Sequence, residues 1–267
     1  MKRGWDATRR NRNIGTVKQG LGQENQLVIP WCGLKLYYEN LTEYKVVLRS
    51  VHSRSLPFIV ERTRADSCHA CTVDDIARVL QYVPSTDFEG IDFIVLRQPK
   101  RKEEIINPVW GRIAYFAEIG AHQGRAIFLE ALNPSKTIRW SKSLTPDRQQ
   151  ELERLRADGH EIVTTRHGHK VSVDLESIRA TQLYRTLLHE IGHSVDNDRD
   201  PAAFDRKGSI EKETFAHQFA DKLRENLVRF GIIPFGRMFD SEIIVRDGLS
   251  VSDFTADSLL NHQSSSA

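Results

Sequence analysis

The chain has 267 residues, 39% of them hydrophobic and 28% charged, which predicts a globular protein with one large core. Its 38 basic and 36 acidic residues nearly balance, so the net charge of +2 excludes a general affinity for nucleic acid or anionic membranes, and no stretch has the roughly 20 apolar residues of a membrane helix or the pattern of a signal peptide. Three cysteines, Cys32, Cys68 and Cys71, are too few for a disulfide framework, so we predict a cytoplasmic protein.

The first segment, residues 1–24, is polar and is predicted to be a disordered basic tail. At its start, five basic residues, Lys2, Arg3, Arg9, Arg10 and Arg12, are opposed only by Asp6. Nucleic acid is expected as a partner only through this tail. Residues 25–70 are rich in β-branched and aromatic residues, in LVIPWCGLKLYYENL and YKVVLRSVHSRSLPFIVERT, and predict a small antiparallel β-rich unit.

Residues 71–250 are expected to form the main domain. Thr72 and Asp75 have the spacing of a capping box at the start of a helix. Three short apolar segments follow, at 91–98, 110–119 and 125–132, and charged or glycine-containing turns separate them. This pattern predicts strands of one main sheet.

The next elements are a helix and a hairpin. Thr145 and Pro146 mark the start of the helix, and Gly159 its end. Residues 161–175 predict a hairpin that turns at His167 and Gly168, and two helices are expected near 175–196 and 209–230. The chain is therefore predicted to be α+β, with residues 251–267 as a second disordered tail.

The first of these two helices contains the motif HExxH, in QLYRTLLHEIGHSVD. Leu183, Leu187 and Ile191 recur at helical spacing, so the motif is predicted on an amphipathic helix. Because four residues make just over one turn, His189 and His193 can present two imidazole nitrogens to one metal ion, with Glu190 beside them. One more protein ligand would complete a catalytic zinc site with an open position for water.

The third ligand is expected from the helix SIEKETFAHQFADKL. Its predicted core face is Ala216, Phe219, Ala220, Leu223 and Leu227. Glu213 extends this face by one turn, whereas Glu211 lies about 200° away around the helix. Residues 194–212 have the composition of a loop and would allow the two helices to pack antiparallel. We therefore predict that Glu213 completes the ligand set.

The segments LLHEIGH and ETFAHQFAD resemble the gluzincin metallopeptidases of the zincin class. They are most similar to the cytoplasmic regulatory peptidases of the ImmA/IrrE type, and also resemble the CaaX-type peptidases of membranes. The resemblance implies His189, His193 and Glu213 as zinc ligands, Glu190 as the base and a zincin-like mixed sheet. His217 stands where relatives have aspartate or asparagine, and it is a candidate for orienting a ligand. The resemblance covers about 45 residues and does not extend to residues 1–170.

The motif and the resemblance together predict a zinc metallopeptidase. Glu190 would activate a zinc-bound water for attack on a peptide bond. The substrate is expected to be a protein or peptide, bound along an edge strand for which RAIFLEAL is the candidate, and selected narrowly by the β-rich unit. The alternative is a degenerate zincin fold that binds a regulatory partner or nucleic acid without hydrolysis.

Two groups of residues remain without a chosen role in the sequence. Tyr184, His122, His167 and His169 are all candidates for stabilising the oxyanion of the reaction. Cys68, His69 and Cys71 have no fourth metal ligand near them in the sequence, so a packed turn is favoured over a metal or redox site.

Overall fold

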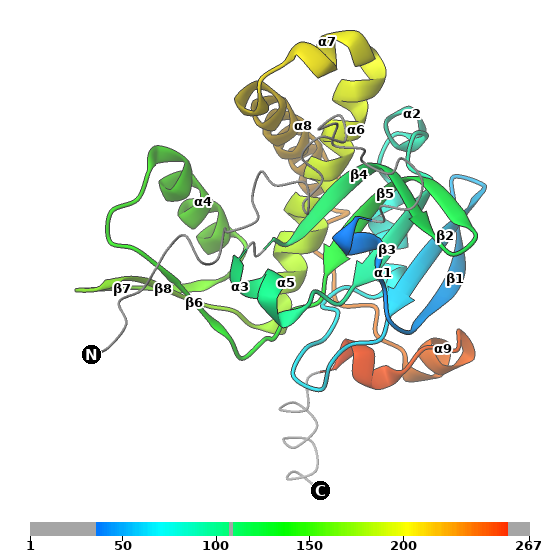
Figure 1. Ribbon diagram of the computed structural model, residues 1–267, viewed down its shortest axis with the longest axis horizontal. Helices are drawn as coiled ribbons and strands as arrows, with labels where there is room; N and C mark the ends of the chain where they lie inside the picture. The colour runs from blue at the N-terminus through cyan, green and yellow to red at the C-terminus, as the bar shows by residue number, and fades with distance from the viewer. Residues whose placement is uncertain (1–35, 107–108, 256–267) are drawn as a thin grey trace, which may run out of the picture. The chain divides into compact units, whose positions relative to one another are not determined.

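The structure is a computed structural model that describes residues 36–106 and 109–255. The strands, labelled in Figure 1, are β1 Tyr44–Val51, β2 Arg54–Glu61, β3 Phe93–Arg97, β4 Gly111–Ile119, β5 His122–Glu130, β6 Thr137–Trp140, β7 Glu161–Thr165 and β8 Gly168–Ser172. The helices are α1 Val73–Leu80, α2 Ser85–Phe88, α3 Arg101–Ile106, α4 Pro146–Ala157, α5 Leu175–Thr181, α6 Leu187–Arg199, α7 Pro201–Arg206, α8 Ser209–Arg229 and α9 Ser241–Arg246. Shorter helical turns are η3 Tyr37–Glu39, η4 Gln182–Thr186 and η5 Val251–Phe254.

A five-stranded mixed sheet forms the centre of the fold, in the order β1-β2-β3-β5-β4. The three inner strands run parallel, and the two edge strands β1 and β4 pair antiparallel with their neighbours. All five residues of β3, FIVLR, are buried. A strand that is buried along its whole length, and apolar in its first four residues, is typical of a parallel sheet that is covered on both faces. The predicted α+β class with a mixed sheet is confirmed.

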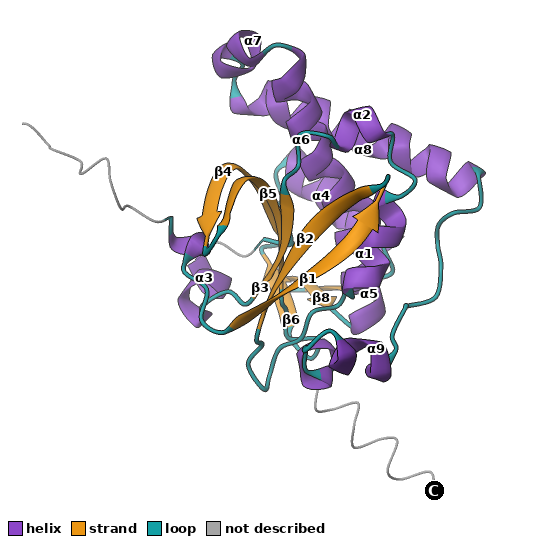
Figure 2. Ribbon diagram, turned by 90° about the vertical axis from the view of Figure 1, so that its right-hand side faces the viewer, coloured by secondary structure: helices purple, strands orange, loops and turns teal. Residues whose placement is uncertain are grey.

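The two faces of this sheet are covered differently. One face packs against α1, α6 and α8 through a large cluster that includes Phe58, Ile94 and Leu188 (Figure 2). The other face carries a smaller cluster, against which Tyr38 of η3 and Tyr44, the first residue of β1, pack. The helix that carries HExxH is therefore held against the main core.

The expected β-rich unit is not separate from the main domain among the described residues. Strand β2 pairs with β3, so β1 and β2 extend the five-stranded sheet instead of forming an independent unit over 25–70. Residues 251–254, predicted as the start of a disordered tail, form η5, in which Phe254 is fully buried. Residues 1–24 and 256–267 lie outside the described residues, so the predictions for both remain untested.

A smaller sheet with the order β6-β8-β7 lies under α4 (Figure 1). Leu152 and Leu155 of α4 pack with Val171 and Ile178 in a third core cluster. Thr145 caps α4, and Gly159 has a φ of 97°, a left-handed conformation that glycine adopts without a steric penalty. The predicted helix and hairpin are confirmed.

Helices α5 and α6 are joined through the π-helical turn η4, and the chain then returns in α8. The predicted loop 194–212 is shorter than expected, because α6 continues to Arg199 and α7 fills part of the remainder. Asp200 caps α7 by accepting a hydrogen bond from the backbone of Ala203, and Pro201 occupies the first turn. Both residues are ordinary helix-start signals. The polar composition of the segment nevertheless favoured the prediction of a loop.

The prediction that RAIFLEAL forms an edge strand is wrong. RAIFLEAL lies mostly in β5, which is an inner strand between β3 and β4, so its backbone has no free edge. The edge strand packed against α6 is β4 instead. Within residues 36–106 and 109–255, no helix has the length and apolar character needed to cross a membrane.

Candidate metal centre

Close packing of α6 on α8 sets the positions of the candidate ligands. A Cβ atom at Gly192 would lie 3.0 Å from Ala216 Cα, 3.1 Å from Ala216 O and 3.2 Å from Phe219 Cβ. A side chain at this position would therefore force the helices apart. Gly192 lies between His189 and His193 in α6, and Ala216 follows Glu213 by three residues in α8. The contact therefore brings the two histidines of α6 close to Glu213 of α8.

Three side chains converge at this contact. His189 Nε2 lies 3.1 Å from His193 Nε2, and Glu213 Oε2 and Oε1 lie 3.2 Å and 3.4 Å from these two nitrogens, respectively. Ligand atoms at about 2.0–2.1 Å from a tetrahedral metal ion lie about 3.3 Å from one another. The separation of the two histidine nitrogens is close to this value, and each oxygen of the Glu213 carboxylate lies at a similar distance from one of them.

His217 also belongs to this group. One ligand atom each from His189, Glu213 and His217 lie within 4.8 Å of one another, so these three residues could hold a metal ion. The rings of His189 and His217 have centroids 4.4 Å apart. His217 is therefore part of the cluster. His189 Nδ1 is buried and has no hydrogen-bond partner among the described residues.

Glu213 and Glu211 have different surroundings. Glu211 caps the start of α8 by accepting a hydrogen bond from the backbone of Gly208 at 3.0 Å. Glu213 faces the histidines, and hydrogen bonds from His189 and His193 hold its pKa well below the usual range. Burial lowers the pKa of His193, but the hydrogen bond to Glu213 and the charge of Glu190 outweigh it, and the net pKa is raised.

Glu190 is buried beside these ligands, with only 7% of its surface exposed. Burial raises the pKa of its carboxyl group, against the opposing effect of His189 and His193. The backbone of Ile113 in β4 also acts to lower this pKa, as the smallest of the causes. The Glu190 carboxylate therefore has a higher proton affinity than one in water.

The cluster opens into a cavity of about 300 Å³ lined by Trp110, Trp140, Arg185, His189, Glu190 and His217. A second cavity, of about 430 Å³, lies between α4 and α8 and is lined by Glu213, Arg154 and Ile210. Glu151 and His217 line both cavities. None of the described residues of β1 and β2 lines either of them. Helix α4 forms part of the wall of both cavities, so among the described residues it is α4, and not β1 or β2, that borders the cluster.

The four proposed oxyanion residues all lie outside the cavity that contains His189. The Tyr184 hydroxyl accepts hydrogen bonds from Arg179 Nη1 and Phe235 N, both at 3.2 Å. His122 begins β5 and packs near Phe93. His167 and His169 line a separate cavity on the small sheet.

Arg185 is the site residue that sequence reasoning missed. It lies one turn before His189, lines the same cavity and is 91% buried, since 9% of its side chain is exposed. Its Nη1 contacts both carboxylate oxygens of Glu151 at 2.8 Å, and its Nε donates to Asp158 at 2.8 Å. The sequence does contain a signal for Arg185, because a spacing of four residues places its side chain on the same face of the helix as His189.

The segment Cys68 to Cys71 forms a packed turn. His69 Nε2 donates to the Glu61 carbonyl at 2.8 Å, and burial lowers the pKa of His69 to about 4. Burial raises the pKa of Cys68 to about 11, and it also raises that of Cys71. Both thiols are free and buried, so neither is suited to act as a thiolate near neutral pH.

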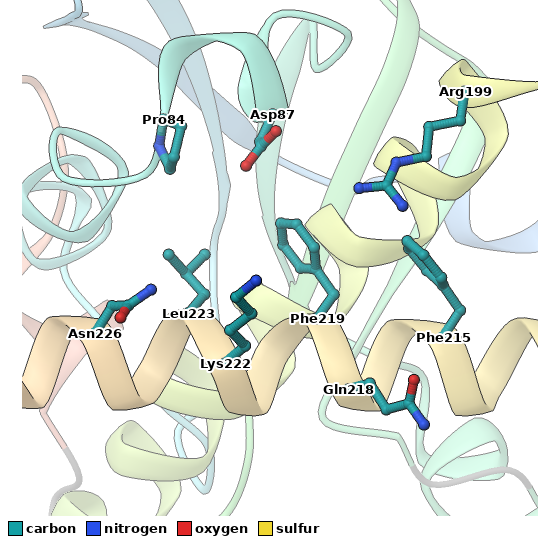
Figure 3. Close-up of a pocket in the computed structure, with 9 residues that line it drawn as sticks. All are labelled: Pro84, Asp87, Arg199, Phe215, Gln218, Phe219, Lys222, Leu223 and Asn226. Atoms are coloured by element: carbon teal, nitrogen blue, oxygen red, sulfur yellow. The ribbon is translucent and has the colours of Figure 1, made fainter.

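A further cavity, of about 420 Å³, lies on a different face of α8 (Figure 3). Phe215, Phe219 and Leu223 form its apolar floor, and Arg199 and Lys222 reach over it. It contains no histidine or cysteine and shares no residue with the cavities beside the metal cluster.

Comparison of the chain with models of protein families, with curated proteins and with solved structures gave no match. The interpretation of the site therefore depends on its own geometry. That geometry provides a histidine and glutamate cluster on two packed helices that could hold a metal ion.

Proposed function

We propose that the chain is a zinc-dependent peptidase in which His189, His193 and Glu213 hold the metal. The observation that carries the proposal is the convergence of two histidine nitrogens, 3.1 Å apart, with the Glu213 carboxylate, whose two oxygens lie 3.2 Å and 3.4 Å from them. Two imidazole nitrogens and a carboxylate are a ligand set that zinc prefers in catalytic sites. Zinc bound there would supply a Lewis acid that makes a water molecule acidic near neutral pH. The resemblance of the two helix segments to gluzincins supports the same interpretation.

Glu190 is the general base in this proposal. It is adjacent to both histidines, buried, and has a raised pKa, which are the properties of a carboxylate that accepts a proton and releases it again. The carboxylate accepts the proton of the attacking water and passes it to the leaving amine.

The substrate is proposed to be a peptide in an extended conformation along β4. This strand is at the edge of the sheet, and β5 occupies only one of its sides. An extended peptide could pair with the other side and gain backbone hydrogen bonds. Gly111 supports this arrangement, because its missing side chain lets β4 approach Thr186 beside the HExxH helix.

Narrow specificity is part of the proposal, and α4 is the element proposed to supply it. The cavities on the two sides of the cluster are bordered by α4 and by Trp110 and Trp140. These walls restrict the substrates that could reach Glu190. The cytoplasm remains the proposed compartment, and the free thiols of Cys68 and Cys71 are compatible with it.

The test is to incubate the zinc-loaded protein with a peptide library and with casein, and to identify the products by mass spectrometry. The proposal expects cleavage of a limited set of library peptides and little cleavage of casein. Glu190→Gln is the matched control, since it is nearly isosteric and cannot accept the proton. If the zinc-loaded wild type cuts nothing that the control leaves intact, the chain is a zinc-binding module and not a peptidase.

A further inference from the structure

The cluster contains one more potential ligand than a catalytic site needs. His189, His193 and Glu213 would already provide three ligands, and His217 lies in the same group. Catalytic zinc sites typically have three protein ligands and an open position, whereas sites with four protein ligands are structural. What keeps His217 from becoming a fourth ligand therefore decides whether the proposed site can act on a substrate.

Arg154 of α4 contacts His217 directly. Arg154 Nη1 lies 3.2 Å from His217 Nε2. A guanidinium group has only donors, so His217 Nε2 must be the acceptor and its ring proton must be on Nδ1. A neutral imidazole has one nitrogen lone pair that can bind a metal ion, and here that lone pair is directed towards Arg154.

The position of Arg154 does not depend on this contact alone. Glu151, one turn earlier in α4, accepts two hydrogen bonds from Arg185 at 2.8 Å. Leu152 and Leu155 anchor the same helix in the core beneath it. Helix α4 is therefore expected to stay in place when Arg154, which is 26% exposed, is replaced.

We propose that Arg154 holds His217 away from the metal and so keeps one coordination position open. Arg154 is a positioning residue, because it acts through His217 and not on the substrate. The inference rests on the proposed metal site. Without Arg154, the lone pair of His217 would be free. A change of side-chain rotamer would then bring this lone pair to the metal, since a ring nitrogen of His217 already lies within 4.8 Å of the ligand atoms of His189 and Glu213.

The experiment uses cobalt(II) in place of zinc and follows the visible absorption of the full-length protein as azide is added. Wild type should bind azide, with a change in the spectrum. Arg154→Leu should bind azide about ten-fold more weakly or worse, since a histidine of the same chain competes at a high effective concentration. Arg154→Lys should behave like wild type, and the double variant Arg154→Leu, His217→Leu should bind azide again. Arg156→Leu, an exposed position on the same helix, is the matched control.

The outcomes separate this inference from the proposed function. Unchanged azide affinity in Arg154→Leu, with cobalt bound, overturns the role of Arg154 alone. A wild type that ignores azide, while His217→Leu responds to it, shows that His217 is already a ligand and also overturns it. Failure of the wild type to bind cobalt at all contradicts the proposed metal site, and the role of Arg154 with it.

Discussion

Replacing Gly192 by alanine is expected to weaken metal binding without touching a ligand. The new Cβ would lie 3.0–3.2 Å from Ala216 and Phe219, whereas carbon atoms in contact prefer about 3.5–4.0 Å. Helices α6 and α8 would have to separate by about half an ångström. Such overpacking costs about 1–3 kcal/mol of folding free energy. The better helix propensity of alanine offsets about 1 kcal/mol of this loss.

The effect on the metal site should be larger than the effect on stability. Glu213 is on α8 and both histidines are on α6, so the separation stretches the ligand set directly. We expect zinc affinity to fall about ten- to hundred-fold, as when a group that orients a ligand is lost. The free energy of unfolding without metal should fall by no more than about 2 kcal/mol, the difference between the two stability effects.

Competition with a chromophoric chelator measures the zinc affinity, and denaturant unfolding of the metal-free protein measures the stability. Gly236→Ala is the control, because no atom lies within 4 Å of the Cβ that it would add. Should Gly192→Ala bind zinc as tightly as wild type and be equally stable, the contact between α6 and α8 does not set the ligand geometry.

Three further predictions concern catalysis and stability. Glu190→Gln should retain zinc and the fold but lose about 10²–10⁴ in turnover, and unchanged peptide hydrolysis would exclude Glu190 as the base. Asp75→Ala should lower the free energy of unfolding by about 3–5 kcal/mol, because it leaves the buried Arg179 without its charge partner at 2.8 Å. Asp74→Ala, at the neighbouring and more exposed position, should cost less than about 1 kcal/mol in the same denaturant titration. Because burial lowers the pKa of His69 to about 4, the unfolded chain binds a proton below about pH 6.5 that the folded chain does not, so stability should fall as the pH falls. Between pH 7 and pH 5 this amounts to about 2 kcal/mol, and His69→Gln should lose that part of the pH dependence in unfolding experiments.

The elements with strong local signals could be predicted from the sequence. Thr72 and Asp75 form the expected capping box, and the helix from Pro146 ends before Gly159 as predicted. The order of strands in the sheet could not be predicted, because pairing between β2 and β3 depends on contacts distant in the sequence. This is also why β5 was mistaken for the edge strand: its apolar pattern is the same whether one or both of its sides are paired.

The residues of the candidate site also divide into those that the sequence predicted and those that it did not. The four-residue spacing of His189 and His193 and the helical position of Glu213 predicted their convergence, since these follow from helix periodicity. Arg154 could not be assigned to the site, because α4 reaches it through tertiary packing alone. Arg185 could have been assigned, since it precedes His189 by four residues on the same helical face. The π-helical turn η4, just before the HExxH helix, also has no simple sequence signal, although such turns often occur at functional sites.

The most direct test of the metal site is the zinc content of the purified protein and of two glutamate variants. We expect about one zinc per chain in wild type and in Glu211→Ala, since the Glu211 side chain only caps α8. Glu213→Ala should lose most of the metal, because it removes the carboxylate that lies 3.2 Å and 3.4 Å from the two histidine nitrogens. Full zinc in Glu213→Ala together with loss of zinc in Glu211→Ala would contradict the proposed ligand set.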